Sequence, residues 1–152
     1  MEYIHYGASK YDPKKFKPIK NCCGFNKPYG GLWASPVTTP MGWKDWNEAE
    51  NFRVCNEQNS FRFKLKSGSK IAYIDSEEKL HTVPDSIKTG CSQKSKFIDF
   101  EKALKLGYDA IEISISKCPS LYWALYGWDC DSIVVLNKGA IEETLLGGND
   151  EH

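Results

Sequence analysis

Short stretches with the two-residue periodicity of β-strands recur along this chain, and helical patterns separate only some of them. Ile111, Ile113 and Ile115 alternate with polar residues, which is typical of a strand with one buried face. Residues 133–136 are all apolar, as expected of a central strand that is buried on both faces. Because strands and helices do not alternate regularly, the pattern predicts an α+β fold with mostly antiparallel strands and two or three helices, not a doubly wound sheet.

Four other segments have the composition and alternation of strands: residues 2–7, 32–35, 61–65 and 70–75. The Ser-Gly-Ser sequence at 67–69 separates the last two segments, so we expect them to pair as a hairpin. Helices are expected in three places. The first begins at Thr39-Pro40, a typical helix start, and runs to about Arg53. The other two are residues 95–107, with Ser95 as the cap and Gly107 at the end, and a short aromatic helix over 119–126.

The length of 152 residues is that of one ordinary domain. We expect a single domain over residues 1–146, followed by a flexible polar tail at 147–152. The formal net charge of zero argues against a dedicated nucleic-acid binder, which usually carries a basic domain. No apolar run approaches the ~20 residues that cross a bilayer, and no apolar leader follows Met1, so a cytoplasmic protein is expected. The six cysteines include no Cys-x-x-Cys pair, which predicts reduced thiols and no metal site.

Residues 10–27 form a lysine-rich segment in which six lysines face a single acid, Asp12. Two prolines in this segment oppose regular secondary structure. The segment is either a solvated connector or a loop that contacts phosphate, and both interpretations remain open. The chain has only two arginines, Arg53 and Arg62, so phosphate contacts would come mostly from lysine or from backbone amides.

A histidine, an aromatic side chain and an acid stand in or beside separate predicted strands: His5, Trp33 and Asp131. These residue types are the ones that cleavage of NAD at the nicotinamide requires. The glycosidic bond breaks with positive charge developing on the ribose, and a nearby carboxylate stabilises that charge. A flat aromatic wall supports the nicotinamide ring, and a histidine holds a ribose. Taken singly, each residue also fits a structural role in a core or at a strand edge.

The motifs around these residues resemble those of the ADP-ribosyltransferases, in the branch of diphtheria toxin and the poly-ADP-ribose polymerases. That family has a histidine in its first strand, a tyrosine in its second strand and a glutamate that opens a later strand. The corresponding sequences here are Tyr-Ile-His-Tyr-Gly-Ala-Ser at 3–9, Gly-Leu-Trp-Ala-Ser at 31–35 and Asp-Ser-Ile-Val-Val-Leu-Asn at 131–137. The resemblance covers residues 3–141. It implies split antiparallel β-sheets around a cleft, with residues 61–75 as the central strand pair.

The resemblance also implies that NAD is the substrate and that no metal takes part. Asp131 would stabilise the oxocarbenium-like sugar, and His5 would hold the other ribose and orient the dinucleotide. The residues expected to bind NAD are His5, Tyr6, Gly7, Trp33 and Ser35.

Asp129 precedes Asp131 by two residues, so on an extended segment both side chains would point to one face. In a related branch of the family an acid or amide at this position helps to place the acceptor, whereas a turn-forming loop aspartate is the alternative. The resemblance places target recognition at Asp129, Tyr126 and Trp128. The aromatic residues at 122–128 either belong to the core or face a protein partner. Trp43 and Trp46 either anchor their helix or give the cleft a second wall.

Three positions depart from the family pattern: Trp33 replaces the tyrosine, Asp131 replaces the glutamate, and Tyr6 stands where many members have glycine. The shorter acid withdraws its carboxylate, and a misplacement near ~1 Å lowers a rate on the order of 10²-fold. The expected function is the transfer of ADP-ribose from NAD to a cytosolic protein, in the manner of a bacterial or phage effector. An inactive binding or inhibitor protein on the same fold and an NAD glycohydrolase are the alternatives.

Overall fold

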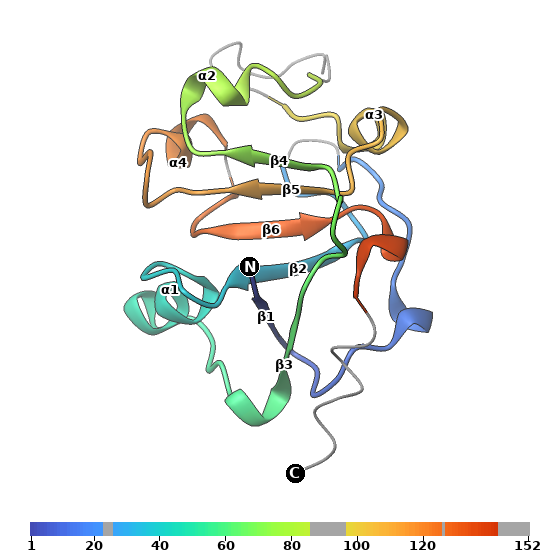
Figure 1. Cartoon of the computed structure of the whole chain (residues 1–152). Coiled ribbons are helices and arrows are strands. Elements are labelled where there is room, and N and C mark those ends of the chain that lie inside the picture. The colour runs from blue at the N-terminus through green and yellow to red at the C-terminus, as the bar shows by residue number, and fades with distance from the viewer. Residues whose placement is uncertain (23–25, 86–96, 126, 143–152) are drawn as a thin grey trace.

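One twisted sheet organises the molecule (Figure 1). The computed structural model describes residues 1–22, 26–85, 97–125 and 127–142. Within these residues, six strands form a single sheet in the order β3-β1-β2-β6-β5-β4. The β4 and β5 strands are parallel, and every other pair is antiparallel, so the fold is α+β with a mostly antiparallel sheet as predicted. The strands are β1 (Tyr3–Tyr6), β2 (Leu32–Pro36), β3 (Ser60–Phe63), β4 (Ile71–Ile74), β5 (Ala110–Ile113) and β6 (Ser132–Val135).

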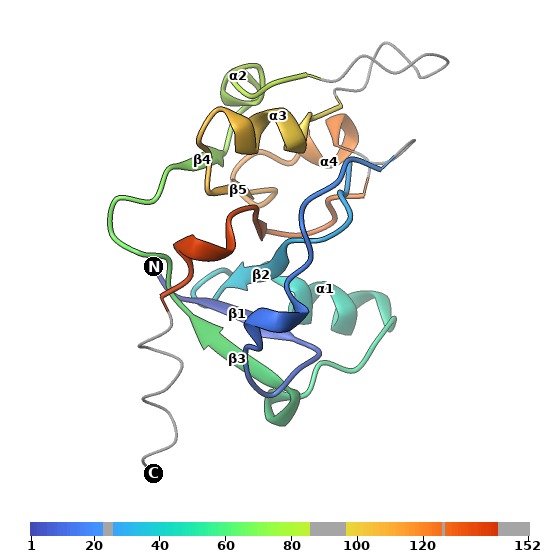
Figure 2. The ribbon, with the colours of Figure 1, turned by 90° about the vertical axis from the view of Figure 1, so that its right-hand side faces the viewer.

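The described residues contain short helices only. The α-helices are α1 (Trp43–Glu50), α2 (Glu77–Leu80), α3 (Phe100–Lys105) and α4 (Leu121–Ala124), and the 3-10 helices are η1 (Pro13–Lys15), η2 (Glu57–Asn59) and η3 (Lys138–Ala140). In Figure 2, α2, α3 and α4 gather around β4 and β5, whereas α1 lies apart from them, beside β1 and β2. In the part of the chain that is described, no helix has the length and apolar character needed to cross a bilayer.

Two apolar cores lie on the two faces of the sheet. The larger core combines Val134 of β6 and Ile111 of β5 with apolar side chains of α2, α3 and α4. The smaller core contains Ile133 and Val135 of β6 together with Phe63 of β3. Successive residues of β6 therefore enter opposite cores, as expected of a central strand that is buried on both faces.

The predicted hairpin between residues 61–65 and 70–75 is wrong. β3 pairs with β1 and β4 pairs with β5, so the two segments form the opposite edges of the sheet and not a central pair. After β3 the backbone pairs with the region of η3: the Lys66 N–H donates to the Ala140 carbonyl at 2.7 Å, and the Glu142 N–H donates to the Lys64 carbonyl at 2.9 Å. The Ser-Gly-Ser turn then redirects the chain toward β4 instead of folding it back on β3.

α1 begins later than the sequence predicts. The Thr39 hydroxyl, expected to cap the helix, accepts from the Met41 N–H at 3.2 Å and donates to Asp131 at 2.6 Å. The helix starts at Trp43 instead, and the Asp45 carboxylate accepts from the N–H of the preceding Gly42 at 2.8 Å. The α3 helix also starts late, after the cap residue Asp99, and the expected cap Ser95 lies outside the described residues, as does the predicted tail at 147–152.

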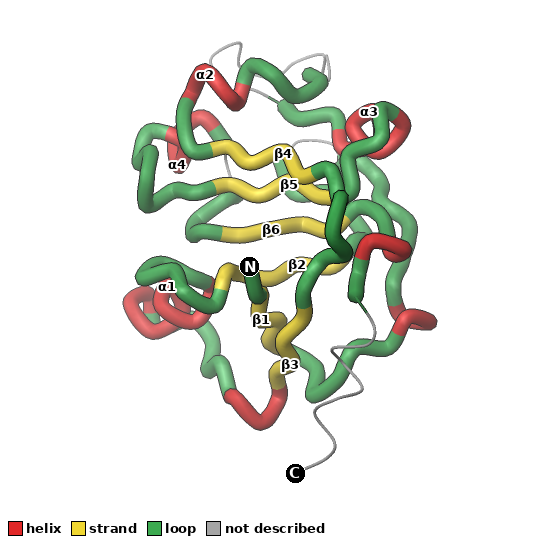
Figure 3. Tube along the Cα trace, viewed as in Figure 1, coloured by secondary structure: helices red, strands yellow, loops and turns green. Residues whose placement is uncertain are grey.

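The sheet bends between β1 and β2. Only Tyr3 and Ile4 of β1 are in register with β2, whereas all four β1 residues are paired with β3. Figures 1 and 3 show β1 and β3 running steeply across the direction of the other strands. Where β1 leaves β2, the ring of His5 bridges the two strands: its Nδ1 lies 2.6 Å from the Trp33 carbonyl oxygen. This bend positions the site described next.

Candidate functional site

A cavity of about 340 Å³ lies where β1 diverges from β2. Its walls come from these two strands, the first residue of α1, the loop around residue 27 and the segment that leads into β6. The volume is within the range of small-molecule sites, on the order of 300–1,000 Å³. The bend of the sheet and the lead-in to β6 thus create a hollow beside two central strands.

The cavity collects most of the residues that the sequence singled out. His5, Tyr6, Trp33 and Ser35 all line it, and so do Trp128 and Asp129. Gly7 and Asp131 are not among the lining residues, and Tyr126 lies outside the described residues. The structure therefore brings His5 and Trp33 together with Asp129, and it places Asp131 elsewhere.

His5 is held in one defined state. A carbonyl oxygen only accepts hydrogen bonds, so Nδ1 carries the proton that it donates to the Trp33 carbonyl. Burial lowers the pKa of the imidazole, and the hydrogen bond to Trp33 opposes this effect. The neutral ring packs against Phe61, with 5.0 Å between the ring centroids. In the neutral ring, Nε2 is left as a hydrogen-bond acceptor, which suits a ligand hydroxyl.

Three tryptophans form the aromatic part of the cavity. Trp33 and Trp128 pack with 4.8 Å between ring centroids. Trp43 of α1 lies across from them in the lining and stacks on Trp46 at 5.4 Å, so it both anchors the helix and forms a second wall. Trp128 is only 1% exposed, and its Nε1 donates to the Asn26 carbonyl at 2.6 Å. Trp128 thus belongs to the core and to the cavity wall, and its role in target recognition stays a prediction.

Three charged side chains also line the cavity: Lys27, Arg53 and Asp129. The Lys27 ammonium lies 5.9 Å from the ring centroid of Trp33 and 5.8 Å from that of Trp43. None of the three is in an ion pair within the described residues. Sequence reasoning included Lys27 in a loop of undecided role and missed Arg53 as a site residue. The sequence carries no signal that singles out Arg53, because Arg62, the other arginine, pairs with Glu2 outside the cavity lining.

Asp131 is 4% exposed, and its carboxylate is fully engaged by the protein. The Ser116 N–H donates to Oδ1 at 2.8 Å, while the Ser116 and Thr39 hydroxyls both donate to Oδ2. The Asp131 N–H in turn donates to the Met41 carbonyl at 2.8 Å. These bonds join the segment before β6 to the loop after β2 and the loop after β5.

The expectation that Asp129 and Asp131 share one face is not met. β6 begins only at Ser132, so residues 129–131 are not a regular strand whose side chains alternate. Asp129 lines the cavity, whereas the Asp131 carboxylate points toward Ser116 and Thr39 and accepts hydrogen bonds from both. The side chain of Asp129 is thus the carboxylate available to a ligand in this cavity.

Cys130 lines the cavity but is not poised as a nucleophile. Burial raises the pKa of its thiol to about 11, an effect that the hydrogen bond with Ser132 only partly opposes. The Cys130 Sγ lies 3.2 Å from the Ser132 hydroxyl oxygen. At neutral pH the group is therefore a thiol, whereas a nucleophilic cysteine acts as the thiolate.

The aromatic cluster at 122–128 divides between core and surface. Trp128 is buried, whereas Trp123 of α4 is 80% exposed and packs edge to face with Tyr122 at 5.0 Å between ring centroids. The core interpretation is therefore confirmed for Trp128, whereas contact with a protein partner stays a prediction.

Within the described residues, no group of three or more His, Cys, Asp or Glu side chains is placed to hold a metal ion. Comparison of the chain with models of known protein families, with curated proteins and with solved structures finds no significant match. The function is therefore argued from the cavity and its chemistry.

Proposed function

We propose that this protein binds NAD in the cavity beside β1 and β2 and transfers its ADP-ribose to a protein acceptor. The observation that carries the proposal is the convergence of His5, Trp33 and Asp129 on one cavity from separate parts of the chain. β1, β2 and β6, in or beside which the three motifs lie, are neighbours in the sheet, and this supports the proposal. The bend between β1 and β2 is consistent with the split sheets that the ADP-ribosyltransferase resemblance implies.

In this proposal the Asp129 carboxylate takes the role predicted for Asp131. The bond between nicotinamide and ribose breaks, and nicotinamide leaves with the electron pair of that bond. Asp129 stabilises the positive charge that develops on the ribose. The acceptor atom then forms the new bond to the same ribose carbon and loses its proton to solvent.

His5 and the tryptophans orient the dinucleotide. The Nε2 atom of neutral His5 accepts a hydrogen bond from a ribose hydroxyl, while Nδ1 stays bonded to the Trp33 carbonyl. The indole faces of Trp33 and Trp43 flank the nicotinamide ring. Fixing the ribose relative to Asp129 in this way supplies the positioning on which such a reaction depends.

A second candidate is a binding protein that does not turn NAD over, and the state of Asp131 favours it. The acid at the position expected to be catalytic is buried and its oxygens are occupied by Ser116 and Thr39. A domain of this kind would hold a nucleotide or block a target enzyme. Hydrolysis of NAD, in which water takes the place of the acceptor, is the third candidate that the experiment must distinguish from transfer and from binding alone.

The test incubates the protein with labelled NAD and cell lysate and compares Asp129→Asn with Asp85→Asn, an exposed control outside the cavity lining. Labelled protein bands that disappear in Asp129→Asn and persist in Asp85→Asn support transfer. Release of nicotinamide without labelled bands supports hydrolysis. NAD binding without nicotinamide release supports the binding protein, and no binding of NAD at all rejects transfer and hydrolysis and leaves only a domain that blocks a target enzyme.

A further inference from the structure

We propose that Lys27 and Arg53 bind the diphosphate of the ligand from two sides of the cavity, and that Lys27 leaves the faces of Trp33 and Trp43 to do so. The inference rests on the proposed function insofar as the ligand is a dinucleotide. It adds the chemical group that the two cations recognise. It also adds a rearrangement that the free protein must undergo before a ring stacks on the tryptophans.

Lys27 occupies the place that a flat ring needs. Its ammonium lies within 6 Å of the centroids of both indole rings, at 5.9 and 5.8 Å. At a partly exposed site, each of these contacts is weaker than a charge-assisted hydrogen bond between a lysine and a phosphate. A ligand that offers a ring and a phosphate therefore displaces the ammonium from the indoles.

The stem of Lys27 is guided by the loop that follows α4. A Cβ placed on Gly127 would lie 3.5–3.6 Å from the Cγ, Cδ and Cε atoms of Lys27, so the lysine stem runs in contact with this glycine. Gly127 has φ +102°, a conformation that L side chains rarely adopt, and the open space at this residue accommodates the stem. Rotation about the side-chain bonds of Lys27 moves the ammonium away from the indoles without a change in the backbone.

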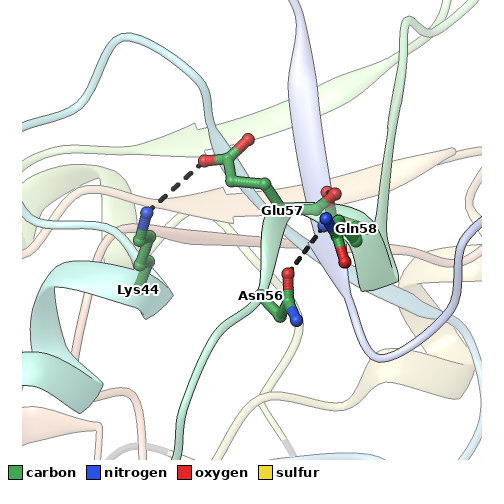
Figure 4. Close-up of polar contacts among 5 residues, drawn as sticks. Lys44, Asn56, Glu57 and Gln58 are labelled. Atoms are coloured by element: carbon green, nitrogen blue, oxygen red, sulfur yellow. Dashed lines mark hydrogen bonds and ion pairs between the residues drawn. The ribbon is translucent and has the colours of Figure 1, made fainter.

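Arg53 is carried by a short loop that is fixed at both ends. Asn51 ends α1 with φ +52°, and the Lys44 ammonium of α1 pairs with the Glu57 carboxylate at 3.4 Å across the loop (Figure 4). Asn56 caps η2 by accepting from the Gln58 N–H at 2.9 Å. The loop thus brings Arg53 to the cavity lining, where its guanidinium carbon lies 5.0 Å from the ring centroid of the adjacent Phe52. The planar donor fork of Arg53 matches the oxygens of a phosphate.

The charges of the cavity match a dinucleotide. Lys27 and Arg53 supply two positive charges, and neither has an ion-pair partner in the described residues. The diphosphate of a dinucleotide carries two negative charges, which leaves Asp129 for the ribose. Since the chain has a net charge of zero and only two arginines, a general excess of basic residues does not explain this placement.

The experiment measures the affinities of ADP, adenosine and nicotinamide by calorimetry at fixed ionic strength, on the wild type, Lys27→Ala and Arg53→Ala. Lys15→Ala and Arg62→Ala are the matched controls: Lys15 is exposed on η1, and Arg62, the other arginine, pairs with Glu2 at 3.3 Å outside the cavity lining. ADP affinity falls by about tenfold or more in each cavity variant, the size of a lost charge-assisted bond, and does not change in the controls. Adenosine affinity does not change in any variant.

A separate measurement tests whether Lys27 leaves the indole faces when the ligand binds. In Lys27→Ala the indole faces are vacant, so nicotinamide, whose ring is uncharged, binds at least as tightly as it does to the wild type. An equal loss of nicotinamide and ADP affinity in this variant rejects the displacement of Lys27. Thermal unfolding of each variant verifies that the fold is kept.

Two results overturn the inference: no binding of ADP to the wild type, or wild-type ADP affinity in both cavity variants. Its failure is distinguishable from failure of the proposed function. If nicotinamide is not released from NAD but ADP affinity follows the expected pattern, the diphosphate site stands and the proposed reaction falls. If ADP-ribose is transferred but the cavity variants bind ADP like the controls, the proposed reaction stands and the diphosphate site falls.

Discussion

At the scale of single residues, burial is the main cause of the raised pKa of Glu112 and of the lowered pKa of His5. Glu112 of β5 is 5% exposed and accepts a hydrogen bond from the Tyr3 hydroxyl at 2.6 Å. Burial raises the pKa of this carboxyl, and the bond from Tyr3 opposes the effect without cancelling it. The sheet therefore contains an acid whose charged form destabilises the fold.

We expect Glu112→Gln to gain stability relative to the wild type as the pH rises. The pKa of Glu112 is higher in the folded state than in the unfolded state, so the wild type loses stability from the unfolded pKa upward through the folded pKa. The variant has no such loss, and its amide oxygen still accepts from Tyr3. Urea unfolding at pH 4, 6 and 8 measures the difference, with Glu78→Gln on exposed α2 as the control. A difference that does not change with pH contradicts the prediction.

We expect His5 to make ligand binding depend on pH in the opposite direction: affinity is lost as the pH falls, whereas stability at Glu112 is lost as the pH rises. Burial lowers its pKa below the ordinary value of 6.5, so the ring stays neutral at pH 7 and Nε2 remains an acceptor. NAD affinity is therefore expected to be constant above pH 6.5 and to fall as the pH drops through the lowered pKa. Calorimetry over pH 5–8 measures this, and His5→Gln, which cannot titrate, should lack the acid-side loss. The loss should persist in His81→Gln, because His81 is exposed and outside the cavity lining.

At the scale of elements, the entry to β2 depends on a glycine. Gly31 has φ +71°, and a Cβ at this position would lie 2.8 Å from the Val135 carbonyl oxygen and 3.0 Å from Ile19 Cδ1 and Val134 Cγ2. No side chain fits between β2 and β6 at this point. The close approach allows the two central strands to meet.

We expect Gly31→Ala to destabilise the protein by about 2–4 kcal/mol, because strain of the left-handed backbone adds to a clash with β6. Gly68→Ala is the matched control. Gly68 has φ +85° but nothing within 4 Å of an added Cβ, so only the backbone cost of about 1 kcal/mol applies. Denaturant unfolding of both variants measures the difference, and equal losses would show that the contact with β6 does not matter.

Strands could be predicted from the sequence as segments, but their partners could not. The alternation at 111–115 and the apolar run at 133–136 indicate β5 and β6 because burial repeats every two residues. The same alternation says nothing about which strand lies alongside, so β3 and β4 were expected to form a hairpin and instead form the two edges.

The residues of the candidate site, too, could be predicted from the sequence only in part. His5 and Trp33 were identified by residue type and by position in strands, and both line the cavity. Asp129 and Asp131 were assigned to one face on the assumption of a regular strand, which the hydrogen bonds of Asp131 break. Arg53 comes from a loop that no periodicity describes, so only the folded chain shows that it reaches the cavity.

At the scale of the whole molecule, the carboxylate of Asp131 joins parts of the chain that are far apart in sequence. Thr39 follows β2, Ser116 follows β5, and both donate to this one side chain. The walls of the cavity depend on how these loops meet. Asp131 therefore acts on the site through the structure that it holds together.

We expect Asp131→Asn to destabilise the whole fold by about 2–4 kcal/mol, because an amide cannot accept from all three donors. Asp129→Asn is expected to change stability by less than about 0.5 kcal/mol, since no side-chain partner holds Asp129 in the described residues. Thermal and denaturant unfolding measure the stability of the two variants, and the activity assay measures their cleavage of NAD. If Asp131→Asn is as stable as the wild type but no longer cleaves NAD, the structural role is wrong and Asp131 is catalytic, as the sequence predicts.

The order of the strands also bears on how the protein is made. β1 and β6 flank β2 in the middle of the sheet, so an early and a late part of the chain meet there. During synthesis, everything up to α4 emerges from the ribosome before the residues that close the hollow. The cavity is therefore incomplete until the segment that leads into β6 has folded against β2, since this segment supplies part of its lining.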